Sequence, residues 1–184
     1  MVRHIIAALL VAAPTGAALG QVDQTGDWAV GAMPHGCMMQ AVSPQGTMLS
    51  VWGISGDDKL GFLLQNKNWN KLRDGASYEL KLDFLGVSSL PVEATARREI
   101  DSDGPGFYFQ VEPGGTGGKR LLDAFTSARG MEISREGRSV DTLPLAGGKG
   151  AMAALARCLA ESWNSGGAEA GLEDFPPEQA GVAI

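Results

Sequence analysis

The segment SYELKLDF, residues 77–84, alternates apolar and polar side chains without interruption. Tyr78, Leu80, Leu82 and Phe84 occupy every second position, and the residues between them are polar. Successive side chains of a β-strand point to opposite faces of a sheet, so this segment predicts a strand with one buried and one solvated face. That pattern is typical of an antiparallel sheet in which one face packs on the core and the other faces water.

The same period of two recurs along most of the chain, and turn-forming residues separate the apolar runs. Gly56-Asp57-Asp58 and Glu136-Gly137 are both hairpin signals. We expect about eight or nine strands in total. The predicted strands lie within residues 28–32, 38–42, 47–55, 59–66, 77–84, 89–100 and 106–112 and in both arms of 131–143.

Two segments switch to the helical period. In residues 118–130 the apolar side chains recur at helical spacing, with Leu121 and Phe125 one turn apart. In residues 148–163 one helix face carries Met152, Leu155, Ala156, Leu159 and Trp163. The expected fold class is α+β and mainly β: an antiparallel sandwich or a strongly curved sheet, with one mid-chain helix and one C-terminal helix.

Residues 1–20 have the features of a secretory signal peptide. Cationic residues precede the apolar run 5–13, and Ala18 and Gly20 place small side chains before a cut at Gln21. The run is too short for a membrane anchor, and no later segment approaches the ~20 apolar residues of a spanning helix. We therefore expect an exported protein, periplasmic or secreted, that does not insert into the membrane after cleavage.

Cleavage would remove Arg3, one of 15 basic residues, and leave 14 against 21 acidic ones, a net charge of −7. An acidic chain without a basic block does not suit nucleic acid or an anionic membrane. Residues 21–164 are enough for a single β-rich domain with a substantial core. Residues 165–184, rich in Gly, Pro and Glu, predict a flexible acidic tail.

Cys37 and Cys158 are the two cysteines of the chain. An oxidising compartment favours a disulfide between them, which would contribute roughly 4–5 kcal/mol on the chain-entropy model. The alternative is a reactive thiolate at Cys37 with His35 as its base. No Asn or Asp lies nearby in the sequence to orient the imidazole. We expect the disulfide, no catalytic residues and no enzymatic activity.

Two loops approach known ligand motifs without completing them. Residues 113–120 lack the first glycine and the Ser/Thr of a P-loop. Asp101 and Asp103 begin a segment that partly follows EF-hand spacing and would end at Glu112. Residues 107–112 predict a strand, however, which would hold Glu112 far from the aspartates. We expect a solvated acidic turn there, no metal and no cofactor, with calcium at the aspartates as the open alternative.

Trp69 stands among amides in a predicted loop, between Asn66, Asn68 and Asn70. A ring that stacks, together with amides that form hydrogen bonds, is typical of a sugar- or peptide-binding loop. In the alternative, the ring folds back and plugs the end of the sheet. These four residues are the ligand-contact candidates of the sequence.

The first residues after the cut resemble invasion-associated locus B-type proteins, which are small Sec-exported envelope proteins of alphaproteobacteria. In that family the first strand runs Gly-Asp-Trp-x-Val and a Cys-led second strand follows. The matching residues here are Gly26, Asp27, Trp28, Val30 and Cys37. Gly31 stands near the place of the family's first cysteine, so the family's local disulfide cannot form.

Residues 68–84 and the terminal helix with Cys158 also look similar to small exported proteins of the same bacteria. The resemblance implies a β-rich envelope domain without an established enzymatic activity.

These observations predict an exported, non-catalytic binding or interaction domain of the bacterial envelope, whose partner is another envelope or secreted protein. A second hypothesis is a periplasmic inhibitor or immunity protein for an exported hydrolase, whose basic surface the acidic chain would complement. A third is a hydrolase that uses paired carboxylates, for example Asp57 with Asp58 or Asp101 with Asp103. Both pairs lie in predicted turns, without the apolar setting that would separate their pKa values.

Overall fold

The computed structural model describes residues 23–98 and 104–164, which form ten strands and two helices. The predicted signal peptide, the predicted acidic tail and the aspartates at 101 and 103 lie outside the described residues.

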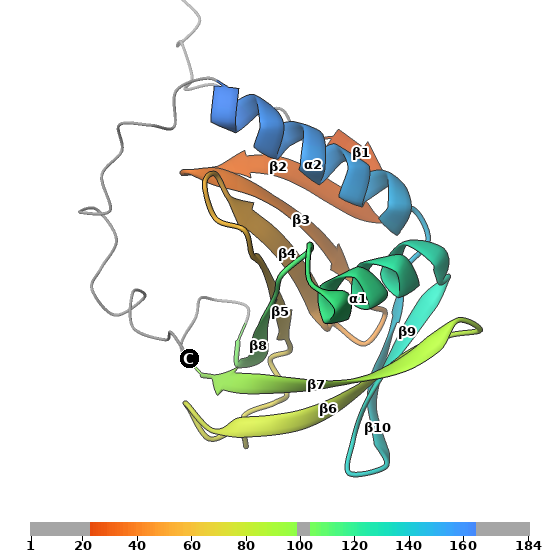
Figure 1. Cartoon of the computed structure of the whole chain (residues 1–184). Helices are drawn as coiled ribbons and strands as arrows, with labels where there is room; N and C mark the ends of the chain where they lie inside the picture. The colour runs from red at the N-terminus through yellow and green to blue at the C-terminus, as the bar shows by residue number, and fades with distance from the viewer. Residues whose placement is uncertain (1–22, 99–103, 165–184) are drawn as a thin grey trace, which may run out of the picture.

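All ten strands belong to one antiparallel sheet (Figure 1), in the order β1-β2-β3-β4-β5-β8-β7-β6-β9-β10. The strands are β1 (Asp23–Thr25), β2 (Trp28–Met33), β3 (Gly36–Val42), β4 (Met48–Ile54), β5 (Leu60–Gln65), β6 (Ser77–Phe84), β7 (Ser88–Arg97), β8 (Gly106–Val111), β9 (Gly130–Arg135) and β10 (Arg138–Pro144). The helices are α1 (Thr116–Ser127) and α2 (Gly148–Asn164). The predicted fold class, α+β and mainly β, is confirmed. Of the two predicted arrangements, sandwich or strongly curved sheet, the structure has the curved sheet.

Strand β6 has the two faces that its alternating sequence predicts. Leu80, Leu82 and Phe84 are almost completely buried. Leu82 lies between Leu90 of β7 and Ile133 of β9 in the register of the sheet. The buried face of β6 therefore continues across both neighbouring strands and forms part of one core.

Strand β1 is the element that the sequence did not predict. Its three residues pair with β2, and the turn between the two strands places Gly26 at φ 64°. The segment Asp-Gln-Thr has no apolar alternation, so it is a strand only because β2 offers it hydrogen bonds.

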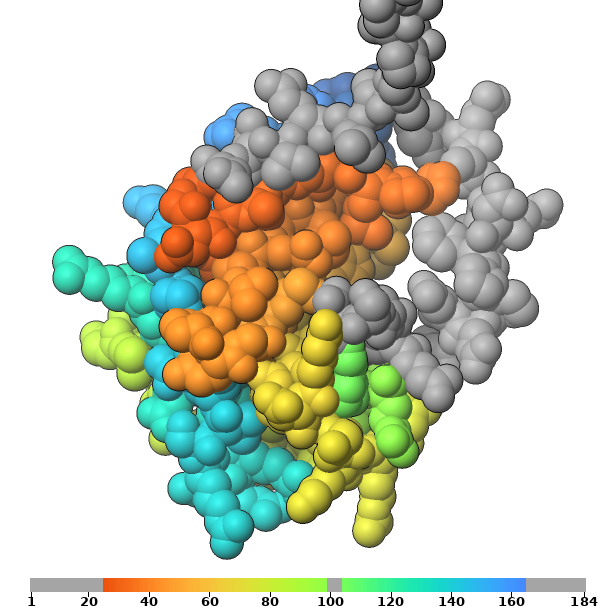
Figure 2. All heavy atoms as spheres, turned by 180° about the vertical axis from the view of Figure 1, so that it is seen from behind, coloured from red at the N-terminus to blue at the C-terminus, as the bar shows by residue number. Residues whose placement is uncertain are grey.

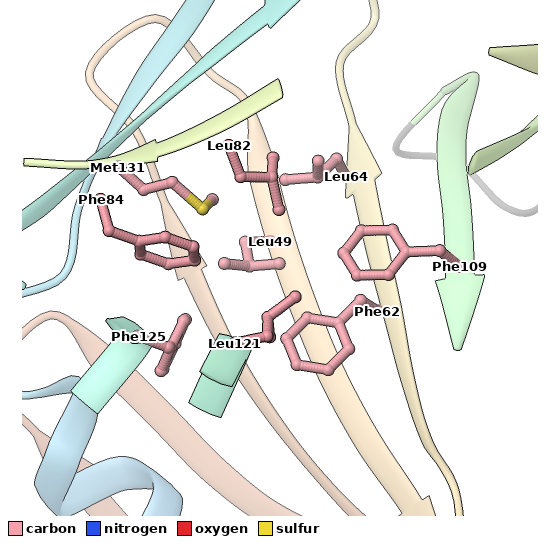
Figure 3. A pocket seen from close by; sticks show the side chains of 9 residues that line it. All are labelled: Leu49, Phe62, Leu64, Leu82, Phe84, Phe109, Leu121, Phe125 and Met131. Atoms are coloured by element: carbon pink, nitrogen blue, oxygen red, sulfur yellow. The ribbon is translucent and has the colours of Figure 1, made fainter. Parts of the chain in front are cut away.

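The helices cover the concave side of the sheet (Figure 1). Leu121 and Phe125 of α1 point into the core, where they meet side chains of several strands (Figure 3). The apolar side chains there surround a void of about 10 Å³. Such a small void without polar lining is a packing gap rather than a ligand pocket.

A buried hydrogen bond joins two distant strands of the sheet. Ser43, which directly follows β3, donates its hydroxyl to Asp141 Oδ2 of the edge strand β10 over 2.9 Å. The Ser43 oxygen accepts the backbone N–H of Thr47 over 3.0 Å. Because β3 is third and β10 tenth in the sheet, this contact shows how strongly the sheet curls.

Candidate functional site

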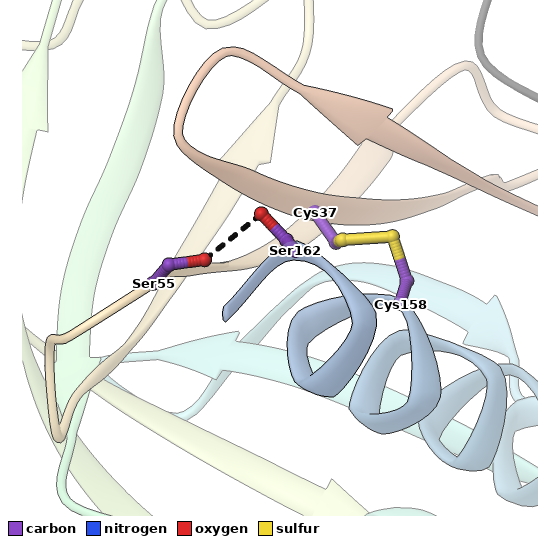
Figure 4. Close-up of a disulfide and its surroundings, with 4 residues drawn as sticks. All are labelled: Cys37, Ser55, Cys158 and Ser162. Carbon is purple, nitrogen blue, oxygen red and sulfur yellow. Dashed lines mark hydrogen bonds between the residues drawn. A yellow bond between two sulfur atoms is a disulfide. The ribbon is translucent and has the colours of Figure 1, made fainter. Parts of the chain in front are cut away.

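Cys37 of β3 and Cys158 of α2 form the predicted disulfide, with a Cα–Cα distance of 6.0 Å (Figure 4). The sulfur of Cys37 is therefore not a thiolate partner for His35. His35 lies in the turn between β2 and β3 at φ 63°, and its backbone carbonyl accepts the N–H of Ser55 over 2.8 Å. The stretch around Cys37 is an anchor for helix α2.

One helical turn beyond the disulfide, a second contact fixes the end of α2. The hydroxyls of Ser55 and Ser162 are 3.0 Å apart and form a hydrogen bond (Figure 4). Ser55 directly follows β4, so this bond joins the last turn of α2 to the turn between β4 and β5. The C-terminal end of the helix is thus held at two points.

Two glycines let apolar side chains of α2 approach the backbone of this region. A Cβ atom at Gly53 would lie 2.7 Å from Leu159 Cδ1, and one at Gly56 would lie 3.3 Å from Trp163 Cζ3. Leu159 and Trp163 are one turn apart on α2, so the two side chains rest on successive parts of the same segment. The turn also needs glycine at position 56, because its φ is +94°.

The end of α2 and the β4–β5 turn enclose an open groove of about 540 Å³, which we name the turn–helix groove. The indole of Trp163 forms part of its wall and is 63% exposed. The groove is lined by Gly53, Ile54, Ser55, Gly56, Asp57, Asp58, Lys59, Leu60, Pro113, Leu159, Ala160 and Trp163. It combines an exposed aromatic ring, aliphatic side chains and carboxylates in one concave surface.

Asp57 also influences an aromatic pair on the outer face of the sheet. Trp52 of β4 and Tyr108 of β8 stack with ring centroids 5.7 Å apart, and the indole covers Gly61 of β5. Burial raises the pKa of the Tyr108 phenol, and the negative charge of Asp57 raises it further, while Arg97 acts in the opposite direction.

Asn66 lies inside the protein rather than on a binding surface. Its side chain is 6% exposed. Its amide nitrogen donates to Thr47 Oγ1 over 2.9 Å, and its amide oxygen accepts the N–H of Asn68 over 2.9 Å. The amide thus holds the loop that follows β5, and it has a structural role.

Trp69 is half-buried and packs against the core from the same loop. Its ring lies 5.2 Å from that of Phe107, centroid to centroid, and Phe107 in turn lies 5.4 Å from Tyr78. These contacts favour the alternative in which the Trp69 ring folds back onto the sheet over the one in which the ring stacks on a ligand. Asn68 and Asn70 are exposed, and their contact with a ligand stays a prediction.

The Trp69 loop and the groove lie at opposite ends of the molecule. Figure 1 shows α2 at the top of the view and the chain after β5 in its lower half, near β6 and β7. Figure 2 shows the same separation from behind, with the loop residues in yellow and α2 in blue. The structure therefore does not join the predicted contact residues to the groove in one site.

The residues of the groove were not predicted as ligand contacts from the sequence. Trp163 was placed on the apolar face of the C-terminal helix, and that placement predicted burial. Ala156, assigned to the same face, is also exposed. A signal was present in the neighbours of Trp163, since Glu161, Ser162 and Asn164 make the last turn of the helix polar.

Within residues 23–98 and 104–164, nowhere do three His, Cys, Asp or Glu side chains gather as a metal site would require. No helix in that part of the chain is long and apolar enough to cross a membrane.

The chain was compared with protein-family models, with curated proteins and with solved structures, and none of them matches. The likeness to invasion-associated locus B-type proteins therefore stays a prediction.

Proposed function

We propose that this chain is an exported, non-catalytic binding domain of the bacterial envelope, and that it engages a partner protein at the turn–helix groove. The observation that carries the proposal is Trp163, which is 63% exposed on a helix end fixed by a disulfide and a hydrogen bond. An aromatic side chain has two rotatable bonds, so it buries a large area on binding and loses little conformational entropy. Such rings are typical anchors of protein interfaces.

The disulfide supports the exported location. A bond between Cys37 and Cys158 is stable in an oxidising compartment and rare in the cytosol. It agrees with the signal peptide that the first 20 residues predict. The expected partner is accordingly an envelope or secreted protein.

The disulfide argues against a nucleophilic Cys37 with His35 as its base. The histidine lies in a strained turn whose backbone is paired to Ser55, and the nearby sulfur of Cys37 belongs to the disulfide. A cysteine nucleophile would need a thiol that is free to transfer its proton to the histidine, and Cys37 has none.

Photo-crosslinking from two alanines of α2 tests the proposal. Ala160 lines the groove, whereas Ala153 is exposed on the same helix and does not line it. With a crosslinking amino acid at Ala160 we expect a defined adduct with an envelope or secreted protein, and we expect that adduct to disappear in Trp163→Ala. Equal adducts from both positions, or an adduct that survives Trp163→Ala, would contradict binding at the groove.

A further inference from the structure

The groove has an apolar floor and an acidic rim. Ile54, Leu60 and Leu159 contribute aliphatic surface, and Trp163 contributes an indole that is mostly open to water. An open indole face attracts a cation as well as apolar groups, because the ring carries negative charge density on its faces. A ligand that fits this surface therefore carries apolar groups and a cation close together.

Three consecutive residues set the charge of the rim. Asp57 and Asp58 are both exposed, and Lys59 offsets one of their two charges. Asp57 Oδ1 accepts the backbone N–H of Lys59 over 3.0 Å, which holds that carboxylate within the turn. The net negative charge beside the indole favours a positively charged ligand.

The C-terminal segment of the chain does not fit this charge. Residues 165–184 begin directly after the last residue of α2 and contain four acidic and no basic residues. Their charge has the same sign as that of the rim, so the two repel each other. The same acidic residues add to the attraction for a basic partner that approaches the end of α2.

Building on the proposed function, we infer that the turn–helix groove binds a basic segment of a partner protein, in which an Arg or Lys side chain stands next to an aliphatic residue. The cation lies over the open face of Trp163 and near the carboxylates of Asp57 and Asp58. The aliphatic neighbour packs on Leu60 and Leu159 in the floor. Because the disulfide fixes α2, this surface is formed before the partner arrives.

Two peptides test this inference on the disulfide-bonded protein. The probe is acetyl-Leu-Arg-Leu-Arg-Leu-amide, and the control replaces both arginines by citrulline, which has nearly the same shape and no charge. Binding is followed in ¹H–¹⁵N spectra, where each tryptophan indole gives its own resonance. We expect the arginine peptide to shift the Trp163 indole and the amides of residues 53–60, and to bind at least about fivefold more tightly than the citrulline peptide.

Matched variants assign the effect to the groove. Trp163→Ala should weaken binding of the arginine peptide about tenfold or more, and Trp163→Phe should retain most of it. The double variant Asp57→Asn/Asp58→Asn should weaken binding about threefold at low salt and have little effect at high salt. The control double variant Glu79→Gln/Asp123→Asn removes two exposed carboxylates that do not line the groove, and it should leave binding unchanged.

The outcomes separate this inference from the proposed function. If both peptides bind the groove equally, the basic partner is wrong while binding at the groove stands. If removal of residues 165–184 moves the Trp163 indole resonance and opens the groove to the citrulline peptide, that segment is the occupant and the inference is overturned. If neither peptide shifts a groove resonance, the inference fails, and crosslinking from Ala160 decides the proposed function independently.

Discussion

Trp69 and Trp163 lie at opposite ends of the molecule and differ in their relation to the core. Trp69 has polar neighbours in the sequence, yet its ring packs on Phe107. Trp163 ends an apolar helix face, yet 63% of it is exposed. The amide neighbours of Trp69 and the helical spacing of Trp163 thus each predicted the wrong surroundings for the ring, although the polar neighbours of Trp163 agree with its exposure.

The difference comes from what each segment meets in three dimensions. The loop around Trp69 closes over β8, whose residues lie about forty positions later in the sequence. Helix α2 has 17 residues, and its last turn faces the β4–β5 turn instead of a strand. A turn covers less of a helix face than a strand of the sheet does, so the last apolar residue of the face stays open to water.

Loss of the disulfide should have the largest effect: it should lower the stability of the whole domain and should loosen the Trp163 end more than the Trp69 loop. The double variant Cys37→Ala/Cys158→Ala should lose roughly 4 kcal/mol of the free energy of unfolding, because the bond spans 121 residues. Urea unfolding measures this loss. Hydrogen exchange should show faster opening in α2 than in the loop after β5.

The control for this prediction is the effect of a reductant. Dithiothreitol should destabilise the native protein by a similar amount and leave the double variant unchanged. A loss below about 1 kcal/mol would show that packing, and not the bond, holds α2 in place.

Removal of the Trp69 ring should have the next largest effect. Trp69→Ala should cost about 2 kcal/mol of folding free energy, less than a fully buried tryptophan, because the ring is half-buried on Phe107. Trp69→Phe should recover part of this loss by keeping a ring contact. A change within about 0.5 kcal/mol for Trp69→Ala would return this residue to the ligand-contact candidates.

The three asparagines of the same loop should differ in their effects on stability. Asn66→Ala should cost about 1–2 kcal/mol, because it leaves the buried hydroxyl of Thr47 and the N–H of Asn68 without their partner. Asn68→Ala and Asn70→Ala remove exposed side chains and should stay within about 0.5 kcal/mol. Thermal unfolding of the three variants checks this order, and equal values would contradict the structural role of Asn66.

The regular elements could be predicted from the sequence because their patterns are local. The alternation in residues 77–84 appears as β6, and Glu136-Gly137 forms the hairpin between β9 and β10. Strand β1 could not be predicted, since its pairing depends on β2 and not on its own residues. The order of the sheet is also non-local, because β5 pairs with β8 and β6 with β9.

The candidate site likewise has one feature that could be predicted from the sequence and one that could not. The disulfide could be predicted because the chain has two cysteines, which allow one pairing. The groove could not, because it depends on where the last turn of α2 meets the β4–β5 turn. Gly53 and Gly56 allow that approach, yet in the sequence they look like ordinary turn glycines.

Removal of the Trp163 ring should have the smallest effect on folding and completes the contrast with Trp69. The indole touches Gly56 with one edge and remains mostly in water, so Trp163→Ala should change the free energy of unfolding by less than about 0.5 kcal/mol. The same variant should abolish crosslinking from Ala160. Urea unfolding and crosslinking on one preparation measure both effects. A loss of 2 kcal/mol or more, as for a core tryptophan, would mean that the ring stabilises the helix end and would remove it as a binding anchor.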